Sequence, residues 1–213
     1  MPTIRLLLAI AINRQWPVLQ LDISNAFLHG DLLDDIYMRQ SLGFTDATSP
    51  NFVCKLHKSL YGLKQAPRQW FQKLTSFLQT KGFRFSRSDP SLLLFTQNQV
   101  QIYFLIYVDN ILVTGNDQSA VQFLLKDLKA NFALKQPSPI SLFLGIQVHK
   151  FMIDYILSQA HFAQKILTDA GFADCKSAPT PISPNSNQLH SNPQPFHDPT
   201  FYRRIAVRSN ICQ

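Results

Sequence analysis

Apolar runs along the chain predict short strands and helices that follow one another closely. Residues 3–14, TIRLLLAIAINR, place apolar side chains on several faces of a helix, which Pro17 ends. An extended run, VLQLDISNAF, then covers 18–27 and is interrupted by an acid, Asp22. Two further strands are expected at FVCKL and SLLLF, residues 52–56 and 91–95.

The most apolar stretch, QIYFLIYVDNILVTG at 101–115, predicts two strands that pair as a hairpin. An acid and an amide, Asp109 and Asn110, lie at its centre, and both tolerate the left-handed backbone of a two-residue turn. Asp109-Asn110 is therefore predicted as the turn. The alternative is that this turn presents a catalytic carboxylate to a metal ion.

Three further helices follow from apolar positions at helical spacing. The first, residues 66–82, has a stripe that ends before Gly82, a typical C-terminal stop. The second starts near Asn116-Asp117, which are good capping residues, and the third covers 158–171. The predicted core stripes are Trp70, Phe71, Leu74, Phe77 and Leu78 in the first and Val121, Leu124, Leu125 and Leu128 in the second.

The C-terminal part of the chain changes in character. The stretch SLFLGIQVHKFMIDYILS, 141–158, is expected to form two strands, the first of which contains a glycine. Residues 179–199 hold six prolines among Ser, Asn and Gln, which predicts a linker or an irregular surface segment. Strands outnumber helices without strict alternation, so the expected class is α+β, an antiparallel sheet backed by helices.

The composition gives the chain a positive net charge and argues against a disulfide framework or a zinc site. The net charge is +7 and the sequence pI is about 9.5, which suits a polyanionic partner such as nucleic acid. Three distant cysteines indicate neither a disulfide framework nor a zinc site. The run LLLAIAI is too short to span a bilayer, and Asn13-Arg14 follow it in place of a cleavage site, so no membrane partner is expected.

Two acids in apolar surroundings suggest metal chemistry. Asp22 ends one strand and Asp109 lies in the hairpin, and an unpaired carboxylate in such surroundings is costly. A shared divalent cation resolves that cost, and oxygen ligands favour Mg²⁺ or Mn²⁺. Two such ions would support in-line phosphoryl transfer. Strand-end acids that face water remain the alternative.

Four motifs stand in an order that resembles the reverse transcriptase of copia-type retrotransposons. They are LDISNAFLHGDLLDDIYM (21–38), SLYGLKQAPRQWF (59–71), YVDNILVTG (107–115) and FLGIQV (143–148). The resemblance implies the palm of a right-hand polymerase over 1–175, with partial fingers. Residues 176–213 would then be a linker and a truncated start of the connection region. It also implies an RNA template, a DNA primer, deoxynucleotides and a cytoplasmic or particle-associated location, and it leaves the oligomeric state open.

The resemblance assigns roles to residues near the two acids. Asp22 and Asp109 match the acids that bind the metal ions, and the carbonyl of Ile23 is expected beside them. Tyr107 and Val108 would place the hairpin under the primer end. The remaining roles implied by the resemblance fall to Phe27 as steric gate against a ribose 2′-hydroxyl, Lys64, Gln65 and Arg68 near the incoming nucleotide, Leu144, Gly145 and Ile146 as primer grip, and Lys135 as a weakly supported proton donor to pyrophosphate.

This chain also departs from the family pattern. Asn110 stands where the family has a second aspartate, which removes a charge and should weaken Mg²⁺ binding. The resemblance begins in mid-domain, so the upstream fingers strands are expected to be missing. There is no glutamate, and Arg39 and Gln147 stand where the family commonly has one, as in an unselected copy.

Three functional hypotheses remain open from the sequence. The first is a truncated reverse transcriptase domain with little activity, so whether this copy is an enzyme stays undecided. The second is a nucleic-acid-binding module that keeps a basic groove without the chemistry. The third is an unstable fragment with no role.

Overall fold

The fold is described from a computed structural model, over residues 2–151, 154–176 and 197–210. The chain divides into two compact units, residues 1–143 with 150–155 and residues 144–149 with 156–213. The first unit holds α1 (Pro2–Asn13), β1 (Val18–Asp22), η1 (Ala26–His29), β2 (Asp31–Arg39), β3 (Val53–Lys58), α2 (Ala66–Thr80), β4 (Arg84–Phe85), β5 (Leu92–Gln97), β6 (Val100–Tyr107), β7 (Asn110–Gly115), α3 (Gln118–Asn131), β8 (Ser138–Pro139) and β9 (Leu142–Phe143). Then come β10 (Ile146–Lys150), β11 (Tyr155–Ser158), α4 (Ala160–Asp169) and α5 (Pro199–Asn210).

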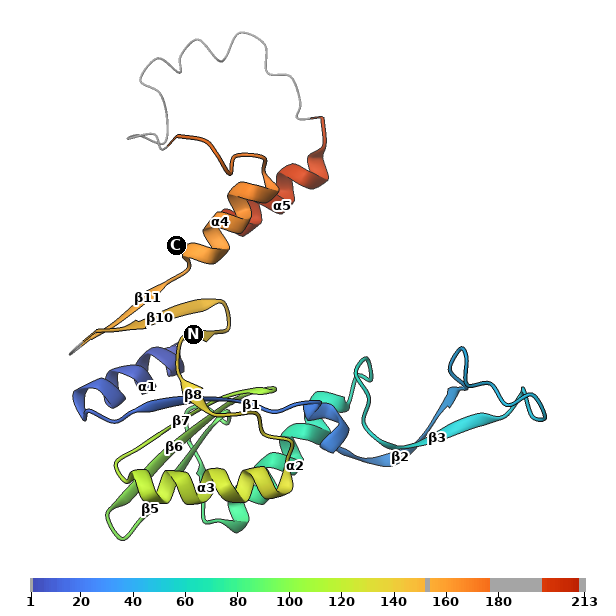
Figure 1. Cartoon of the computed structure of the whole chain (residues 1–213), viewed down its shortest axis with the longest axis horizontal. Helices are drawn as coiled ribbons and strands as arrows, with labels where there is room; N and C mark the ends of the chain where they lie inside the picture. The colour runs from blue at the N-terminus through green and yellow to red at the C-terminus, as the bar shows by residue number, and fades with distance from the viewer. Residues whose placement is uncertain (1, 152–153, 177–196, 211–213) are drawn as a thin grey trace. The chain divides into compact units, whose positions relative to one another are not determined.

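A six-stranded antiparallel sheet forms the centre of the first unit, in the order β4-β5-β6-β7-β1-β8 (Figure 1). The hairpin β6–β7 is its middle, and β1 joins through the register Val18 to Thr114 and Asp22 to Asn110. The expectation of an antiparallel sheet with helices is confirmed. The most apolar strands of the sequence therefore lie at the centre of the sheet.

One face of the sheet packs on α2 and α3. Alternate residues of the central strands point into this core, because successive side chains of a strand face opposite ways. They meet the two helical stripes predicted from the sequence, whose main members are buried. The cluster includes Leu21, Ile23, Leu93, Ile102, Phe104, Ile106, Ile111 and Val113 with Trp70, Leu74, Leu78, Val121, Leu124, Leu125 and Leu128.

The opposite face is covered at one end by α1, which lies across the sheet from α3 (Figure 1). Trp16, just after α1, makes an edge contact with Tyr103, and their ring centroids are 5.5 Å apart. The Thr114 hydroxyl donates to the Pro17 carbonyl at 2.9 Å. Asp22 and Asn110 lie at the other end of the same face, where both remain partly exposed.

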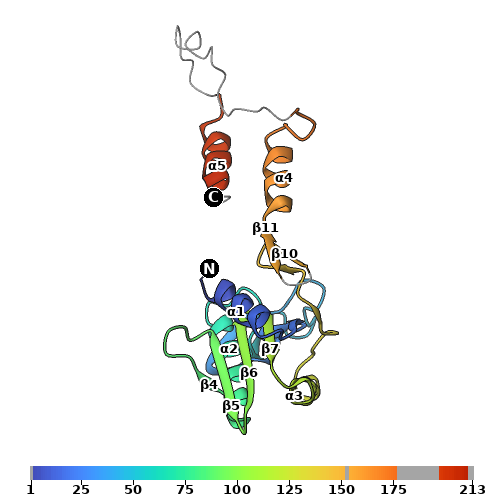
Figure 2. The same cartoon turned by 90° about the vertical axis from the view of Figure 1, so that its left-hand side faces the viewer.

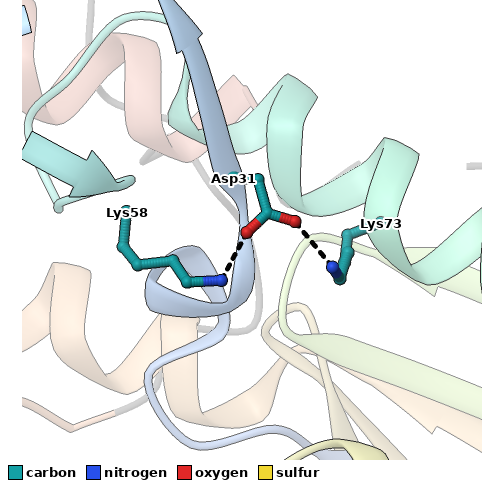
Figure 3. A network of polar contacts seen from close by, with 3 residues as sticks. All are labelled: Asp31, Lys58 and Lys73. Carbon is teal, nitrogen blue, oxygen red and sulfur yellow. Dashed lines mark hydrogen bonds and ion pairs between the residues drawn. The ribbon is translucent and has the colours of Figure 1, made fainter.

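The two-stranded sheet β2–β3 extends away from the central sheet as a separate hairpin (Figure 1). Its base is the only part tied closely to α2. Asp31 lies between Lys58 and Lys73, and each ammonium binds one carboxylate oxygen (Figure 3). At Gly30 a Cβ would meet the Cβ of Gln69 at 3.0 Å, so a larger residue there would push against α2.

The second unit is smaller and mainly helical. Within it, α4 and α5 contact each other, and Arg208 binds Asp169 at 2.5 Å (Figure 2). The sequence predicted α4, and Gly171 follows it with a left-handed backbone as expected of a helix stop. The boundary predicted at residue 175 stays a prediction, and the proline-rich segment lies, up to residue 196, outside the described residues.

Three details of the sequence prediction are wrong. The extended run 18–27 splits, because β1 ends at Asp22 and Asn25, with φ 53°, starts a short 3-10 helix. The stretch 141–158 holds β9, β10 and β11 instead of two strands, and Gly145 lies between strands with φ 80°. Strand β2 and helix α5 were not predicted.

The third error concerns the hairpin turn. Tyr107 pairs with Asn110, so the two turn residues are Val108 and Asp109, not Asp109 and Asn110. Val108 takes φ 60°, which is unusual for a β-branched residue. Asn110 is held as a strand residue because it pairs with Tyr107 on one side and Asp22 on the other, and this pairing outweighs its local turn preference.

Candidate active site

The pairing of β6, β7 and β1 places three predicted site residues in one row. Tyr107 lies opposite Asn110, and Asn110 lies opposite Asp22. Directly opposed residues of an antiparallel sheet share a face, so the three side chains point the same way. Leu21, Ile23 and Ile111 point the other way, into the core, which sends the polar row to the open face.

The segment 133–135 extends this row. Ile23 and Leu134 form an antiparallel bridge, the Lys135 N–H donates to the Asp22 carbonyl at 2.9 Å, and the Ser24 N–H donates to the Ala133 carbonyl at 2.9 Å. Lys135 consequently lies beside Asp22, and its Nζ is 2.8 Å from Asp22 Oδ2. The hydrogen bond and the charge of Asp22 raise the pKa of the Lys135 ammonium, and the charge of Asp109 adds to the effect.

The turn that carries Asp109 is held from two sides. The indole N–H of Trp70, in α2, donates to the Val108 carbonyl at 2.7 Å. The Ile23 N–H donates to the Asp109 carbonyl at 3.3 Å, which joins the turn to the end of β1. Asn110 Nδ2 donates to Asp109 Oδ1 at 3.0 Å, so the amide occupies one oxygen of the neighbouring carboxylate.

The residues predicted to contact the nucleotide come from two neighbouring segments. Phe27 lies in η1 and is partly buried, and its ring centroid is 4.5 Å from that of Tyr61. Gln65 is the residue before α2, and Lys64 is exposed. The contact with Tyr61 fixes one side of the predicted gate ring.

The structure thus gathers Asp22, Ile23, Tyr107, Asp109 and Asn110, with Lys135 added to them. The predicted primer-grip residues Leu144, Gly145 and Ile146 belong to the second unit, and their role stays a prediction. Sequence reasoning assigned no role to Tyr61 or to the Trp70 indole. The YG pair within SLYGLKQAP and the tryptophan of the apolar helical stripe were the available signals.

The donor set suits a hard divalent cation, although only two carboxylates contribute to it. Mg²⁺ is commonly held by one or two protein carboxylates together with substrate phosphates and water, which Asp22 and Asp109 satisfy. Among the residues that the structure describes, no group of three His, Cys, Asp or Glu side chains is placed to hold a metal. Asn110 stands directly opposite Asp22 and contributes no carboxylate to this row.

No helix within residues 2–151, 154–176 and 197–210 has the length and apolar character needed to cross a membrane.

Comparisons with known proteins give the same family as the motifs. The profile of the family described as reverse transcriptase (RNA-dependent DNA polymerase) matches residues 1–184. The chain is 41% identical to the Retrovirus-related Pol polyprotein from transposon RE1 of Arabidopsis thaliana over 95% of its own length. It is 38% identical to the Retrovirus-related Pol polyprotein from transposon TNT 1-94 of Nicotiana tabacum over 86% of its length.

These alignments cover about 14% of each of those two polyproteins. A shorter relative, the Putative transposon Ty5-1 protein YCL074W of Saccharomyces cerevisiae, is 27% identical over 90% of the chain and 63% of its own length. The matched family and these relatives agree with the four motifs and with the mixed fold with antiparallel sheets. The chain belongs to the reverse transcriptase family, as a reverse transcriptase domain of the copia type.

Proposed function

We propose that this domain is built for RNA-templated DNA synthesis, in which a primer 3′-hydroxyl attacks a deoxynucleoside triphosphate. The observation that carries the proposal is the position of Asp22 and Asp109 at the open end of the sheet. The strand carrying Asp22 pairs with β7, and Ile23 binds the turn residue Asp109 through its backbone. Two acidic residues from distant parts of the sequence are therefore brought to the same end of the sheet by backbone pairing.

The six-stranded sheet would be the palm, and the β2–β3 hairpin would be part of the fingers. Template RNA and primer would cross the open face, in keeping with the net charge of +7. Membership of the family supports this arrangement. The longer polyproteins to which the chain is similar are the context in which the domain would act.

Each residue of the row has a proposed task. Asp22, Asp109 and the Ile23 carbonyl would hold Mg²⁺ or Mn²⁺, which when bound activates the 3′-hydroxyl and stabilises the leaving pyrophosphate. Phe27, backed by Tyr61, would exclude a ribose 2′-hydroxyl. Lys135, beside Asp22, would donate a proton to the leaving pyrophosphate.

Gln65 and Lys64 would contact the incoming nucleotide, and Tyr107 would support the primer end. Leu144, Gly145 and Ile146 would hold the primer strand. The left-handed backbone at Leu144 and Gly145 is compatible with a tight main-chain turn there.

Asn110 should lower the activity of this copy. It replaces a metal-binding oxygen with an NH₂ group, and that group binds Asp109 Oδ1. A cation must therefore compete with the amide for one oxygen of the remaining turn acid. We expect weak metal binding and slow synthesis by the chain as it stands.

Primer extension on poly(rA)/oligo(dT) with Mg²⁺ or Mn²⁺ tests the proposal. We expect little extension by the natural chain, more by Asn110→Asp, and none by Asp22→Ala in either background. Extension that survives Asp22→Ala would contradict the assigned chemistry. If Asn110→Asp stays inactive while it binds primer-template, Asn110 is not the main cause of low activity.

A nucleic-acid-binding module without chemistry is the second candidate. The ion pair between Lys135 and Asp22 favours it, because the site is partly neutralised without any metal. Fluorescence anisotropy with labelled primer-template would distinguish the two candidates. Tight binding by the natural chain and by Asn110→Asp, with no extension by either, would support the binding module.

A further inference from the structure

Lys135 is attached to Asp22 through both its backbone and its side chain. The main-chain N–H donates to the Asp22 carbonyl at 2.9 Å, and Nζ lies 2.8 Å from Asp22 Oδ2. The position of Lys135 beside Asp22 is therefore set by the backbone as well as by the side-chain contact. The bridge between Ile23 and Leu134 fixes Lys135 opposite Asp22, and the burial of both bridge residues sends their neighbours to the open face.

The groups around the ammonium are mostly negative or polar. Asp22 and Asp109 both act on Lys135 electrostatically, while Asn110 is neutral. Neighbouring carboxylates repel each other, and a nearby positive charge offsets part of that repulsion. In this chain a lysine supplies that charge where the proposed function requires a divalent cation.

We propose that Lys135 is a built-in counter-ion of Asp22 that competes with the divalent cation for this carboxylate. This inference rests on the proposed function, because it assumes that Asp22 is a metal-binding residue. Metal binding then requires the Lys135 side chain to leave Asp22 Oδ2. Once displaced, the same ammonium is free to approach the departing pyrophosphate. Lys135 would thus neutralise Asp22 before the metal binds and donate to pyrophosphate afterwards.

The effect of Lys135 on metal affinity can be predicted in size. A unit charge a few ångströms from a cation in water, together with an exposed ion pair that must break, should change metal affinity by roughly three- to tenfold. Asn110 makes the competition more effective, because the cation gains no third carboxylate in return. The lysine would matter less in a chain with aspartate at 110.

Manganese binding tests the inference without any measurement of catalysis. Mn²⁺ alone is titrated into the natural chain, Lys135→Met and Lys135→Gln, and free Mn²⁺ is measured by electron paramagnetic resonance. Lys129→Met, which changes an exposed residue of α3, is the control with the same change in net charge. Asp22→Asn, in the natural and Lys135→Met backgrounds, reports whether binding occurs at this site. Circular dichroism verifies that each variant is folded, and the glutamine variant keeps a polar side chain should methionine prevent folding.

We expect Lys135→Met and Lys135→Gln to bind Mn²⁺ about three- to tenfold more tightly than the natural chain. Lys129→Met should stay within about twofold of it, because salt screens distant charges. If both Lys135 variants match Lys129→Met while Asp22→Asn removes binding, the counter-ion role is overturned and the metal site stands. If Asp22→Asn changes nothing in either background, the metal site fails and the counter-ion role fails with it.

Discussion

Two antiparallel hairpins of this domain are stabilised in different ways. In β6–β7 nearly all residues are buried or partly buried, and several of them belong to the core packed against α2 and α3. In β2–β3 no residue is buried, and Phe52 beside the hairpin is 72% exposed, whereas Phe104 in β6 is fully buried. The same local pairing thus occurs once inside a core and once in solvent.

The comparison shows which contacts fix the candidate site. The turn that carries Asp109 is held by the core, through Trp70 and Ile23. The β2–β3 hairpin is held at its base, by the close approach of Gly30 to α2 and by the charges around Asp31 (Figure 3). We therefore expect the end of the sheet that carries Asp109 to respond to core mutations, and the β2–β3 hairpin to respond to salt and pH.

The largest expected effect is on the free energy of unfolding, when a buried phenylalanine of β6–β7 is removed. Phe104→Ala should lower the free energy of unfolding by about 3–5 kcal/mol, because a fully buried ring leaves a cavity. Phe52→Ala is the matched control and should stay within about 0.5 kcal/mol, because its ring is already in water. Urea unfolding followed by circular dichroism measures both. Equal losses would contradict the contrast between the two hairpins.

A smaller loss of stability, confined to the β2–β3 hairpin, is expected from Asp31→Asn. The carboxylate binds Lys58 and Lys73, and exposed ion pairs of this kind contribute about 0.2–1 kcal/mol each. Amide hydrogen exchange should accelerate over residues 31–58 and stay unchanged in β6 and β7. Asp127→Asn, which removes the pair with Lys81 beside α3, is the control and should leave exchange in 31–58 unaltered. Acceleration across the central sheet would show that the hairpin is not a separate unit of stability.

The smallest expected effect is a loosening of the same hairpin in acid. The hydrogen bonds from Lys58 and Lys73 lower the pKa of Asp31 from 3.8 to about 2. A depressed pKa means that the stabilisation is complete above about pH 4 and is lost as pH falls toward 2. Hydrogen exchange over 31–58, compared between pH 4 and pH 2, should rise beyond its intrinsic change in the natural chain. Asp31→Asn should lack this additional rise, and the same rise in both chains would rule out Asp31 as its cause.

The sequence predicted the helices of the first unit well. Apolar residues at helical spacing gave α2 and α3 with their core stripes, and Asp117 accepts from the Ala120 N–H as the expected helix cap. Strands were located less well, because β2 has no fully buried residue and its sequence, with Asp34-Asp35 at the centre, lacks the regular apolar alternation that marks a half-buried strand. The error at the turn has a similar origin, since local preference favoured Asn110 while pairing with two strands decided the outcome.

The sequence by itself determined the family, the apolar strands that form the sheet, and the two acids proposed for the chemistry. These are local or pattern-based properties, which single residues and their spacing carry. Only the tertiary structure decided that Asn110 stands opposite Asp22, that Trp70 holds the turn, and that Lys135 covers the carboxylate. Each of these contacts joins residues far apart in the chain. The pairing of β1 with β7, the packing of α2 and the bridge between Ile23 and Leu134 bring them together, and no short stretch of sequence specifies these by itself.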